Sequence, residues 1–312
     1  MEKMIDWAAL WKELVWRRGW NYQRDESPDS HDLWRVRATQ FDESVRRRWA
    51  KPDSSRALIL SMLDAIPGAT VLDIGAGTGQ WAILMASHAA RVTAVERSPS
   101  MLNVMRENLD VHNVTNVDIV QDVWPLTSIG THDFTLCSHA MYGFYDFPTT
   151  IRSIQAVTRQ MCFLLMRAPT MDSVMAEASL RVWGNPYDSA NYQVAFNALL
   201  QMGIFPNVIM EDSGLWGPWV SKNLDEALLE IKHRIGLVDT KEHDEFLLDL
   251  LMRRLTYVDD TYVWPRGMRT ALIFWPVQAE AQRAMDYRAS VRVDTPFPPN
   301  GGTVQTFRSD AA

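Results

Sequence analysis

The sequence predicts a doubly wound α/β fold with a mostly parallel sheet of about seven strands. Three observations support this prediction. Short apolar runs alternate with helical segments from residue 70 onward, a glycine-rich turn directly follows the first apolar run, and further helical segments precede the first strand and interrupt the last ones. Strands that alternate with helices at this spacing are typical of a parallel sheet with helices on both faces.

The region before residue 70 predicts three helices. Apolar residues recur at three- and four-residue spacing from Trp7 to Val15, and again from about His31 to Trp49. Asp53 or Ser54 can cap a third helix that continues to a Pro-Gly turn. We expect residues 1–66 to form a helical cap that precedes the α/β domain.

Five short apolar runs predict the first buried strands. They are Val71–Ile74, Val92–Val95, Val117–Val120, Phe134–Cys137 and Met161–Met166. The helical segments between them are Gln80–His88, Pro99–Val111 and Pro148–Arg159. This regular alternation indicates that consecutive strands are joined by helical crossovers.

The alternation becomes less regular after Pro169. The remaining predicted elements are a helix over Tyr192–Met202, a strand over Asn207–Met210, helices over Leu224–Ile235 and about His243–Arg254, and a last strand over Arg269–Trp275. We expect residues 67–277 to form the α/β domain, with a helical insertion at about 221–256 and an antiparallel last strand. Residues 278–312 show no clear period and predict a C-terminal tail.

Composition excludes several classes of protein. The 312 residues carry a net charge of −7, and this acidic balance makes a nucleic-acid partner unlikely. No apolar run is long enough for a membrane-spanning helix. Cys137 and Cys162 cannot make a disulfide framework, so a reduced, cytoplasmic setting is expected. The sequence leaves the oligomeric state open.

The strongest local signal is the segment Val71-Leu-Asp-Ile-Gly-Ala-Gly-Thr-Gly-Gln. A buried strand leads directly into Gly75, Gly77 and Gly79, and then into a helix whose N-terminus offers free N–H groups to a ligand. The dinucleotide fingerprint G-x-G-x-x-G would need a third glycine where Gln80 stands. The carboxylate of Asp73 suits a ligand amine better than a pyrophosphate, which it would repel.

The segment D-I-G-A-G-T-G resembles the first motif of the class I S-adenosylmethionine-dependent methyltransferases. This resemblance implies a Rossmann-like fold with S-adenosylmethionine as the cofactor. It also implies that Glu96 accepts both ribose hydroxyls, that Met101 packs on the adenine, and that Ser138 belongs to the family's fourth motif. Asp122 matches an acid that binds the adenine amino group, although Asp118 on the same strand leaves a structural role open for it. The implied cofactor residues are Asp73, Gly75, Gly77, Gly79, Glu96, Met101, Asp122 and Ser138.

Two residues beyond the fourth strand are the candidate catalytic residues. His139 is a candidate general base, and Tyr142 is a candidate positioning hydroxyl or a ring that faces the sulfonium. A hydrogen-bonded core role is the alternative for His139. Arg167 ends the fifth strand, where a pair with a surface acid is favoured over a pair with an anionic acceptor. Cys137 and His139 lack further ligands nearby in the sequence, so no metal site is expected.

Tryptophan is abundant, and six of the 13 residues fall within the first fifty. We expect Trp7, Trp11, Trp34 and Trp49 to be buried. An alternative is an aromatic lid over the acceptor, with Trp20 and Tyr22 as candidates, while Trp81 and Trp124 are candidates to touch the nucleoside.

The predicted function is methyl transfer from S-adenosylmethionine to a small organic acceptor. One alternative is an RNA or protein methyltransferase, which would need a basic face. The other is a protein that binds the cofactor without catalysis, as a sensor or an assembly subunit.

Overall fold

Seven strands form one sheet in the order β3-β2-β1-β4-β5-β10-β6. They are β1 (Thr70–Ile74), β2 (Arg91–Glu96), β3 (Val117–Gln121), β4 (His132–Ser138), β5 (Thr158–Pro169), β6 (Asn207–Glu211) and β10 (Met268–Pro276). The computed structural model describes residues 5–17, 32, 34–211 and 218–277.

The first five strands of the sheet run parallel. β1 lies between β2 and β4, with Val71 aligned to Val92 on one side and to Phe134 on the other. β10 is inserted antiparallel between β5 and β6. The prediction of a doubly wound, mostly parallel sheet with an antiparallel last strand is confirmed, and the carboxyl ends of the parallel strands meet at one edge.

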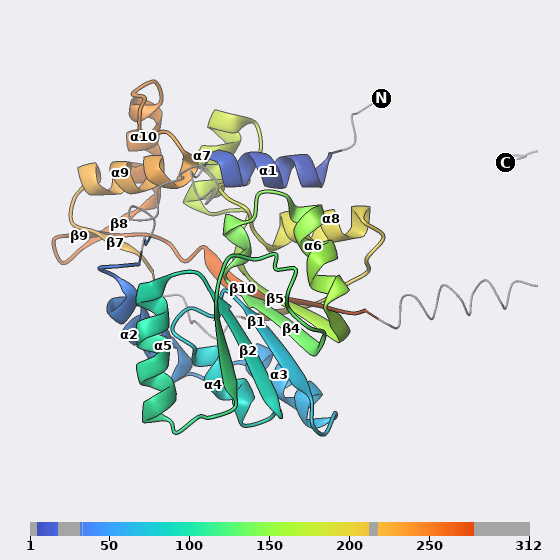
Figure 1. Cartoon of the computed structure of the whole chain (residues 1–312). Coiled ribbons are helices and arrows are strands. Elements are labelled where there is room, and N and C mark those ends of the chain that lie inside the picture. Colours follow the sequence, from blue (N-terminus) through green and yellow to red (C-terminus); the bar gives the residue numbers. More distant parts are fainter. Residues whose placement is uncertain (1–4, 18–31, 33, 212–217, 278–312) are drawn as a thin grey trace, which may run out of the picture. The chain divides into compact units, whose positions relative to one another are not determined.

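Helices cover both faces of the sheet (Figure 1). α3 (Ser54–Asp64), α4 (Gln80–Ala86) and α5 (Pro99–Val111) cover one face, and α1 (Trp7–Arg17), α6 (Phe147–Ala156) and α8 (Tyr192–Gln201) cover the other. Alternate residues of each strand supply the two cores. In β1, Val71 packs under α3 and α4, whereas Leu72 and Ile74 face the opposite core with α1 and α6.

The segment between β6 and β10 is mainly helical, as the sequence predicts. It contains α9 (Leu224–Ile235) and α10 (Asp244–Arg254), which share a third core with α7 (Val174–Trp183). A small antiparallel sheet, β7 (Val220–Ser221), β9 (Thr261–Val263) and β8 (Thr256–Val258), flanks these helices. The remaining described elements are α2 (Ala38–Trp49) and the short helix η1 (Met141–Gly143).

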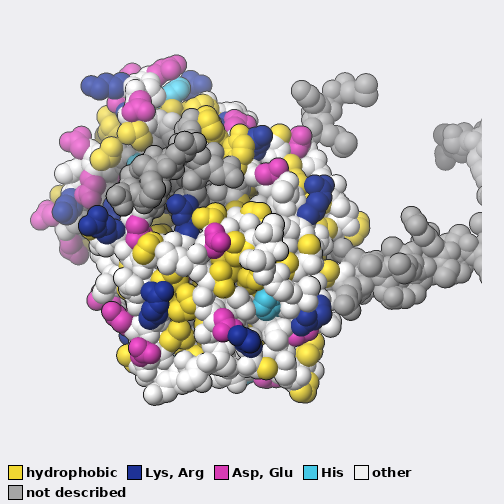
Figure 2. Space-filling model, viewed as in Figure 1, with side chains coloured by type: hydrophobic (Ala, Val, Ile, Leu, Met, Phe, Trp, Pro, Cys, Tyr) yellow, Lys and Arg dark blue, Asp and Glu magenta, His cyan; other side chains and the backbone are white. Residues whose placement is uncertain are grey.

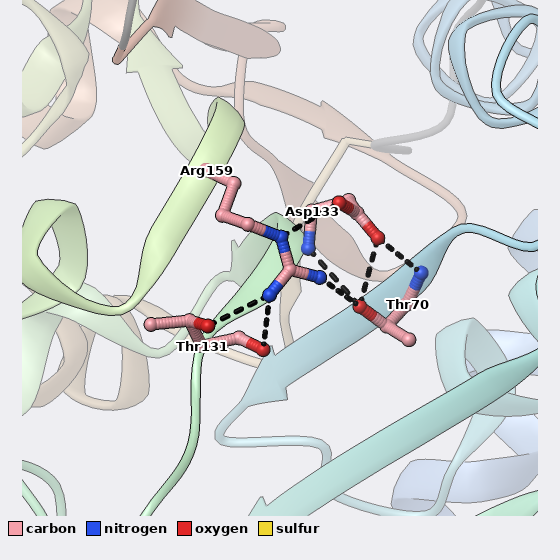
Figure 3. Close-up of polar contacts among 4 residues, drawn as sticks. All are labelled: Thr70, Thr131, Asp133 and Arg159. Carbon is pink, nitrogen blue, oxygen red and sulfur yellow. Dashed lines mark hydrogen bonds and ion pairs between the residues drawn. The ribbon is translucent and has the colours of Figure 1, made fainter.

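The sequence misplaces the boundary between α6 and β5. The helix begins earlier because the Asp146 side chain accepts a hydrogen bond from the Thr149 N–H at 3.0 Å. The strand begins at Thr158 instead of Met161 because Arg159 is held at the sheet edge by polar partners on neighbouring strands. Its guanidinium donates to Asp133 at 2.9 Å and to the Thr70 hydroxyl at 3.0 Å (Figure 3).

Other elements depart from the sequence prediction. α2 begins at Ala38 instead of near His31, which lies outside the described residues, and Trp34 begins a turn before it. α7 was not predicted; the Ser173 hydroxyl caps it by accepting from the Ala176 N–H at 3.1 Å. The three strands of the small sheet are too short to give a sequence pattern.

The first tryptophans differ in burial. Trp11 is fully buried, and its indole N–H donates to the Phe144 carbonyl at 2.7 Å. Trp7 packs edge-to-face on Tyr187, while Trp16 stays 45% exposed. Trp20 and Tyr22 lie outside the described residues. The tryptophans of α1 therefore serve mainly to attach this helix to the sheet.

One compact unit ends at Val277, and the predicted tail over residues 278–312 lies outside the described residues. The division into a helical cap over residues 1–66 and an α/β domain stays a prediction. Within the described part of the chain, no helix has the length and apolar character needed to cross a membrane.

Candidate active site

A cavity of about 510 Å³ lies at the edge of the sheet where the parallel strands end. Its walls come from the carboxyl ends of β1, β2, β4 and β5, from the residues that follow β1, β2, β3 and β4, and from α2. This volume falls within the usual range of small-molecule sites. In open α/β sheets, ligands bind at this carboxyl edge.

The glycine-rich turn after β1 forms the floor of the cavity. Gly75 has φ +71°, and its N–H donates to the Val95 carbonyl at 2.8 Å. A Cβ on Gly75 would lie 2.3 Å from the Cβ of Ala140, so only glycine fits between β2 and the residues after β4. Gly79, with φ +84°, is the residue that precedes α4.

Glu96 joins this turn to the end of β2. Its carboxylate accepts hydrogen bonds from the Gly77 N–H at 2.9 Å and from the Ser98 N–H at 2.8 Å. Burial raises the pKa of Glu96, while these backbone hydrogen bonds act in the opposite direction. The fixed carboxylate lines the cavity and can accept further hydrogen bonds from ligand hydroxyls.

Asp73 supplies a second acid to the same wall. It is 1% exposed, and its Oδ2 atom has no hydrogen-bond partner among the described residues. Burial and, secondarily, the charge of Glu96 raise the pKa of Asp73 to about 7. A buried carboxylate oxygen without a partner is costly, so a donor from a ligand would complete the site.

The other predicted cofactor residues also converge here. All of the predicted cofactor residues line the cavity except Gly79, which precedes α4. Met101 is buried on α5, Ser138 ends β4, and Asp122 is exposed one residue after β3. Asp118 does not line the cavity and instead forms an ion pair with Arg91. Of the two acids, only Asp122 therefore lies at the cavity.

Trp81 and Trp124 both line the cavity while they pack in the two cores. The Trp124 indole N–H donates to the Ser153 hydroxyl at 2.8 Å. Trp34 and Trp49 line the cavity from α2 and the turn before it, and Trp49 meets Trp81 edge-to-face. These side chains give the cavity aromatic walls.

A polar network that the sequence did not reveal holds α2 over the glycine turn. The buried Asp42 side chain accepts hydrogen bonds from Gln80 at 3.2 Å and from Asn108 at 3.0 Å. Asn108 also donates to the Thr78 carbonyl at 2.8 Å. In the sequence, the one unusual feature among these residues is Gln80, which stands where the dinucleotide pattern has its third glycine.

A second unpredicted contact ties the N-terminal region to the end of β2. The Asp32 side chain accepts from the Ser98 hydroxyl at 2.6 Å and from the Ser100 N–H at 3.0 Å. Ser98 is the residue whose N–H donates to Glu96. Asp32 therefore helps to order the segment on which Glu96 depends.

His139 and Tyr142 meet in the lining of the cavity. His139 follows β4 with φ +54°, and its Nδ1 lies 3.1 Å from the Tyr142 hydroxyl. That hydroxyl accepts a hydrogen bond from the Arg167 N–H at 2.6 Å. Burial, together with the charges of Arg48 and Arg167, lowers the pKa of His139 to about 3. The imidazole is therefore neutral at neutral pH.

The structure places Arg167 at the cavity, and the favoured interpretation of this residue as one half of an ion pair with a surface acid stays a prediction. Arg167 lines the cavity, and its guanidinium carbon lies 4.4 Å from the centre of the Tyr142 ring. The cause is the length of β5, which continues past Met166 to Pro169 and carries Arg167 to the carboxyl edge of the sheet.

Arginine clusters occur at residues 46–48 and 253–254, and acids pair with a member of each. Arg46 pairs with Asp42, and Arg253 pairs with Asp249 and Glu177. On the face drawn in Figure 2, Lys and Arg side chains are interspersed with Asp and Glu side chains. No group of three or more candidate metal ligands occurs in the described ranges.

Comparison with known proteins decides the family. The family model described as a methyltransferase domain matches residues 71–161, which include the glycine turn, Glu96 and Asp122. The chain carries a class I S-adenosylmethionine-dependent methyltransferase domain. The predicted family and cofactor class are confirmed at the level of this domain.

The names of curated relatives of the methyltransferase domain give several different methyl acceptors. A malonyl-[acyl-carrier protein] O-methyltransferase of Serratia marcescens is 28% identical over 46% of this chain and 53% of its own length. A cobalt-precorrin-6B C(15)-methyltransferase of Salmonella typhimurium is 36% identical over 26% of this chain and 43% of its own length. A probable ribosomal RNA small subunit methyltransferase A of Methanosphaera stadtmanae is 28% identical over 27% of this chain and 31% of its own length. The chain thus spans about half or less of these relatives.

Solved structures resemble the chain over a larger part of its length. The YcgJ protein of Bacillus subtilis covers 72% of this chain and matches over 97% of its own, with 17% identity and a TM-score of 0.49. The plantazolicin methyltransferase BpumL covers 86% of this chain and matches over 98% of its own, with 13% identity and a TM-score of 0.49. The fold assignment rests on the strand order and register given above.

Proposed function

We propose that the methyltransferase domain transfers a methyl group from S-adenosylmethionine to a small organic acceptor. The observation that carries this proposal is the convergence of Asp73, Glu96 and the glycine turn on one cavity at the carboxyl edge of the sheet. The remaining wall of the same cavity holds His139, Tyr142 and Arg167. One space therefore has an end for the cofactor and an end for the acceptor.

The residues at the cofactor end fit S-adenosylmethionine. Asp73 offers a buried carboxylate oxygen without a partner, which suits the ammonium group of the cofactor. Glu96 is fixed by two backbone N–H groups and offers its remaining lone pairs to the ribose hydroxyls. Met101 and Asp122, which line the cavity, are proposed to contact the adenine ring and its amino group.

The cofactor supplies an electrophilic methyl group on a positively charged sulfur. The protein then has to align the acceptor atom and exclude water. Tyr142 is suited to positioning, because its hydroxyl is fixed by the Arg167 N–H and by His139. A pKa of about 3 makes His139 a weak general base. We therefore infer that the acceptor atom binds in a protonation state that can attack the methyl group without losing a proton to His139.

A small acceptor is supported by what surrounds the cavity. α2 is held over the glycine turn by Asp42, and Trp219 and Arg234 close another side from the segment around α9. A cavity of this volume with walls on several sides suits a small molecule better than an RNA or protein chain. The names of the Serratia and Salmonella relatives give malonyl-[acyl-carrier protein] and cobalt-precorrin-6B as what those proteins methylate.

The test is a transfer assay with S-adenosylmethionine labelled on its methyl group. The protein is incubated with a cell extract, and label is measured separately in small molecules, RNA and protein. We expect label in the small-molecule fraction. Label in RNA or protein would overturn the small-acceptor proposal, and tight cofactor binding without any labelled product would favour a non-catalytic sensor.

A further inference from the structure

Three arginines reach the acceptor end of the cavity from separate elements. Arg48 comes from α2, Arg167 from β5 and Arg234 from α9, and all three line the cavity. The side chain of Arg234 is 19% exposed. Three guanidinium groups that approach one partly buried space from different directions are a feature that the cofactor does not explain.

Two of these arginines lie over aromatic rings. The guanidinium carbon of Arg167 lies 4.4 Å from the centre of the Tyr142 ring, and that of Arg234 lies 3.7 Å from the centre of the Trp219 ring. Contact with an aromatic ring restricts a guanidinium group and leaves its planar fork of N–H groups available for an anion. Such a group is suited to a planar or tetrahedral oxyanion.

The charges around the arginines include both signs. Glu230 pairs with Arg234, and Asp188 also lies in the electrostatic field of that side chain. Asp53 lines the cavity as well, but its side chain caps α3 by accepting from the Arg56 N–H at 3.0 Å.

The arginines also act on one another and on their neighbour. Arg167 lowers the pKa of Arg234, although burial lowers it more, and Arg48 and Arg167 both contribute to the low pKa of His139. Arg167 and Arg234 are therefore close enough to repel each other, and Arg48 and Arg167 both lie close enough to His139 to act on it. A bound anion would offset this repulsion.

We infer that Arg167 and Arg234, together with Arg48 in the lining of the same cavity, form a subsite for an oxyanion of the methyl acceptor. The acceptor is accordingly a small molecule with a carboxylate or phosphate group. Trp219 and Trp49 line the same cavity, so we expect the rest of the acceptor molecule to be apolar or aromatic. This inference rests on the proposed function, because it assigns the second ligand of the same cavity.

The test uses the full chain, first titrated and then saturated with S-adenosylhomocysteine. Benzoate, phenyl phosphate and the neutral isostere benzamide are then titrated by calorimetry. We expect at least one anion to bind at least about tenfold more tightly than benzamide. The comparison of the two anions shows whether the subsite prefers a carboxylate or a phosphate.

Variants identify the residues responsible. Arg167→Gln and Arg234→Gln are each expected to weaken anion binding about tenfold while the affinity for S-adenosylhomocysteine stays the same. Arg234→Lys keeps the charge but loses the planar fork, and an intermediate affinity is expected. Arg181→Gln is the matched control, because Arg181 is exposed on α7, lies 6.0 Å from the Phe246 ring and does not line the cavity.

The outcomes separate this inference from the proposed function. If the wild-type chain does not bind S-adenosylhomocysteine, the proposed function fails and this inference fails with it. If the cofactor product binds but benzamide binds as tightly as both anions, only the oxyanion subsite is overturned. Loss of cofactor affinity in both glutamine variants would also overturn it, because the arginines would then hold the carboxylate of the cofactor.

Discussion

Replacement of Gly75 by alanine tests the close approach that shapes the cavity floor. Gly75 has φ +71°, a conformation that costs an L-residue about 1–2 kcal/mol. The added Cβ would also lie 2.3 Å from the Cβ of Ala140. Relief of that overlap requires backbone movement, which costs a further ~1–3 kcal/mol. We therefore expect Gly75→Ala to lower the free energy of unfolding by about 2–5 kcal/mol.

Gly68→Ala is the matched control for this variant. Gly68 has φ +78°, but a Cβ there meets nothing within 4 Å. It should lose only about 1–2 kcal/mol, the cost of the backbone conformation alone. Urea unfolding of both variants, followed by calorimetric titration with S-adenosylhomocysteine, separates the two contributions. Cofactor affinity should fall for Gly75→Ala and stay unchanged for Gly68→Ala.

A double-mutant cycle identifies the atom responsible. Ala140→Gly removes the Cβ that Gly75→Ala would meet, so the double variant should be more stable than the sum of the two single effects predicts. The reasoning is refuted if Gly75→Ala is no less stable than Gly68→Ala, or if the cycle shows no coupling between positions 75 and 140.

Three further predictions concern ionisable groups. Glu96→Gln should weaken S-adenosylhomocysteine binding by about 10–100-fold, because charge-assisted hydrogen bonds are lost, while the exposed Glu107→Gln should not; an unchanged dissociation constant for Glu96→Gln would contradict the ribose assignment. His139→Ala should lower turnover with cofactor affinity nearly kept. The pKa of His139 is about 3, so its ring is neutral above that pH, and an inflection near neutral pH that disappears in this variant would instead establish a general base. Asp133 has its pKa lowered from 3.8 to about 2, chiefly by Arg159, so the stability that it contributes is present above pH 3.8 and lost toward pH 2. The destabilisation by Asp133→Asn should therefore shrink over that window in urea unfolding, and a pH-independent difference would count against the ion pair.

The sequence predicts the sheet, and it predicts that the proposed cofactor residues come together, because both signals are local. Each strand of the parallel sheet is a continuous apolar run, and the glycine turn, Glu96 and Asp122 follow such runs directly. Because the strands are parallel, residues that follow their carboxyl ends all lie at the same edge of the sheet. Periodicity is therefore enough to bring these side chains together.

The acceptor end depends on contacts between distant parts of the chain. Arg234 lies 67 positions after Arg167 and reaches the cavity only because α9 packs against α7, the helix that follows β5. Asp42 contacts Asn108 across 66 positions, and nothing in its helix distinguishes it from a solvated acid. Sequence periodicity predicts which face of a helix is buried, but it does not identify the partner of a buried polar group.

The extension of β5 shows the same limit on a smaller scale. Thr158 and Arg159 are polar and continue a helical pattern, so they were assigned to the preceding helix. Hydrogen bonds from Arg159 to Asp133 and Thr70, on two neighbouring strands, bring this segment into the sheet instead. Tertiary contacts override local propensity at this boundary.

The most direct test of the cofactor assignment is a calorimetric titration of the full chain with S-adenosylhomocysteine and, separately, with NAD. The cavity places the carboxylates of Asp73 and Glu96 where a pyrophosphate would be repelled and where an amine and a ribose would be bound. We predict saturable binding of S-adenosylhomocysteine at one site and no detectable binding of NAD. Saturable binding of NAD without binding of S-adenosylhomocysteine would contradict the account.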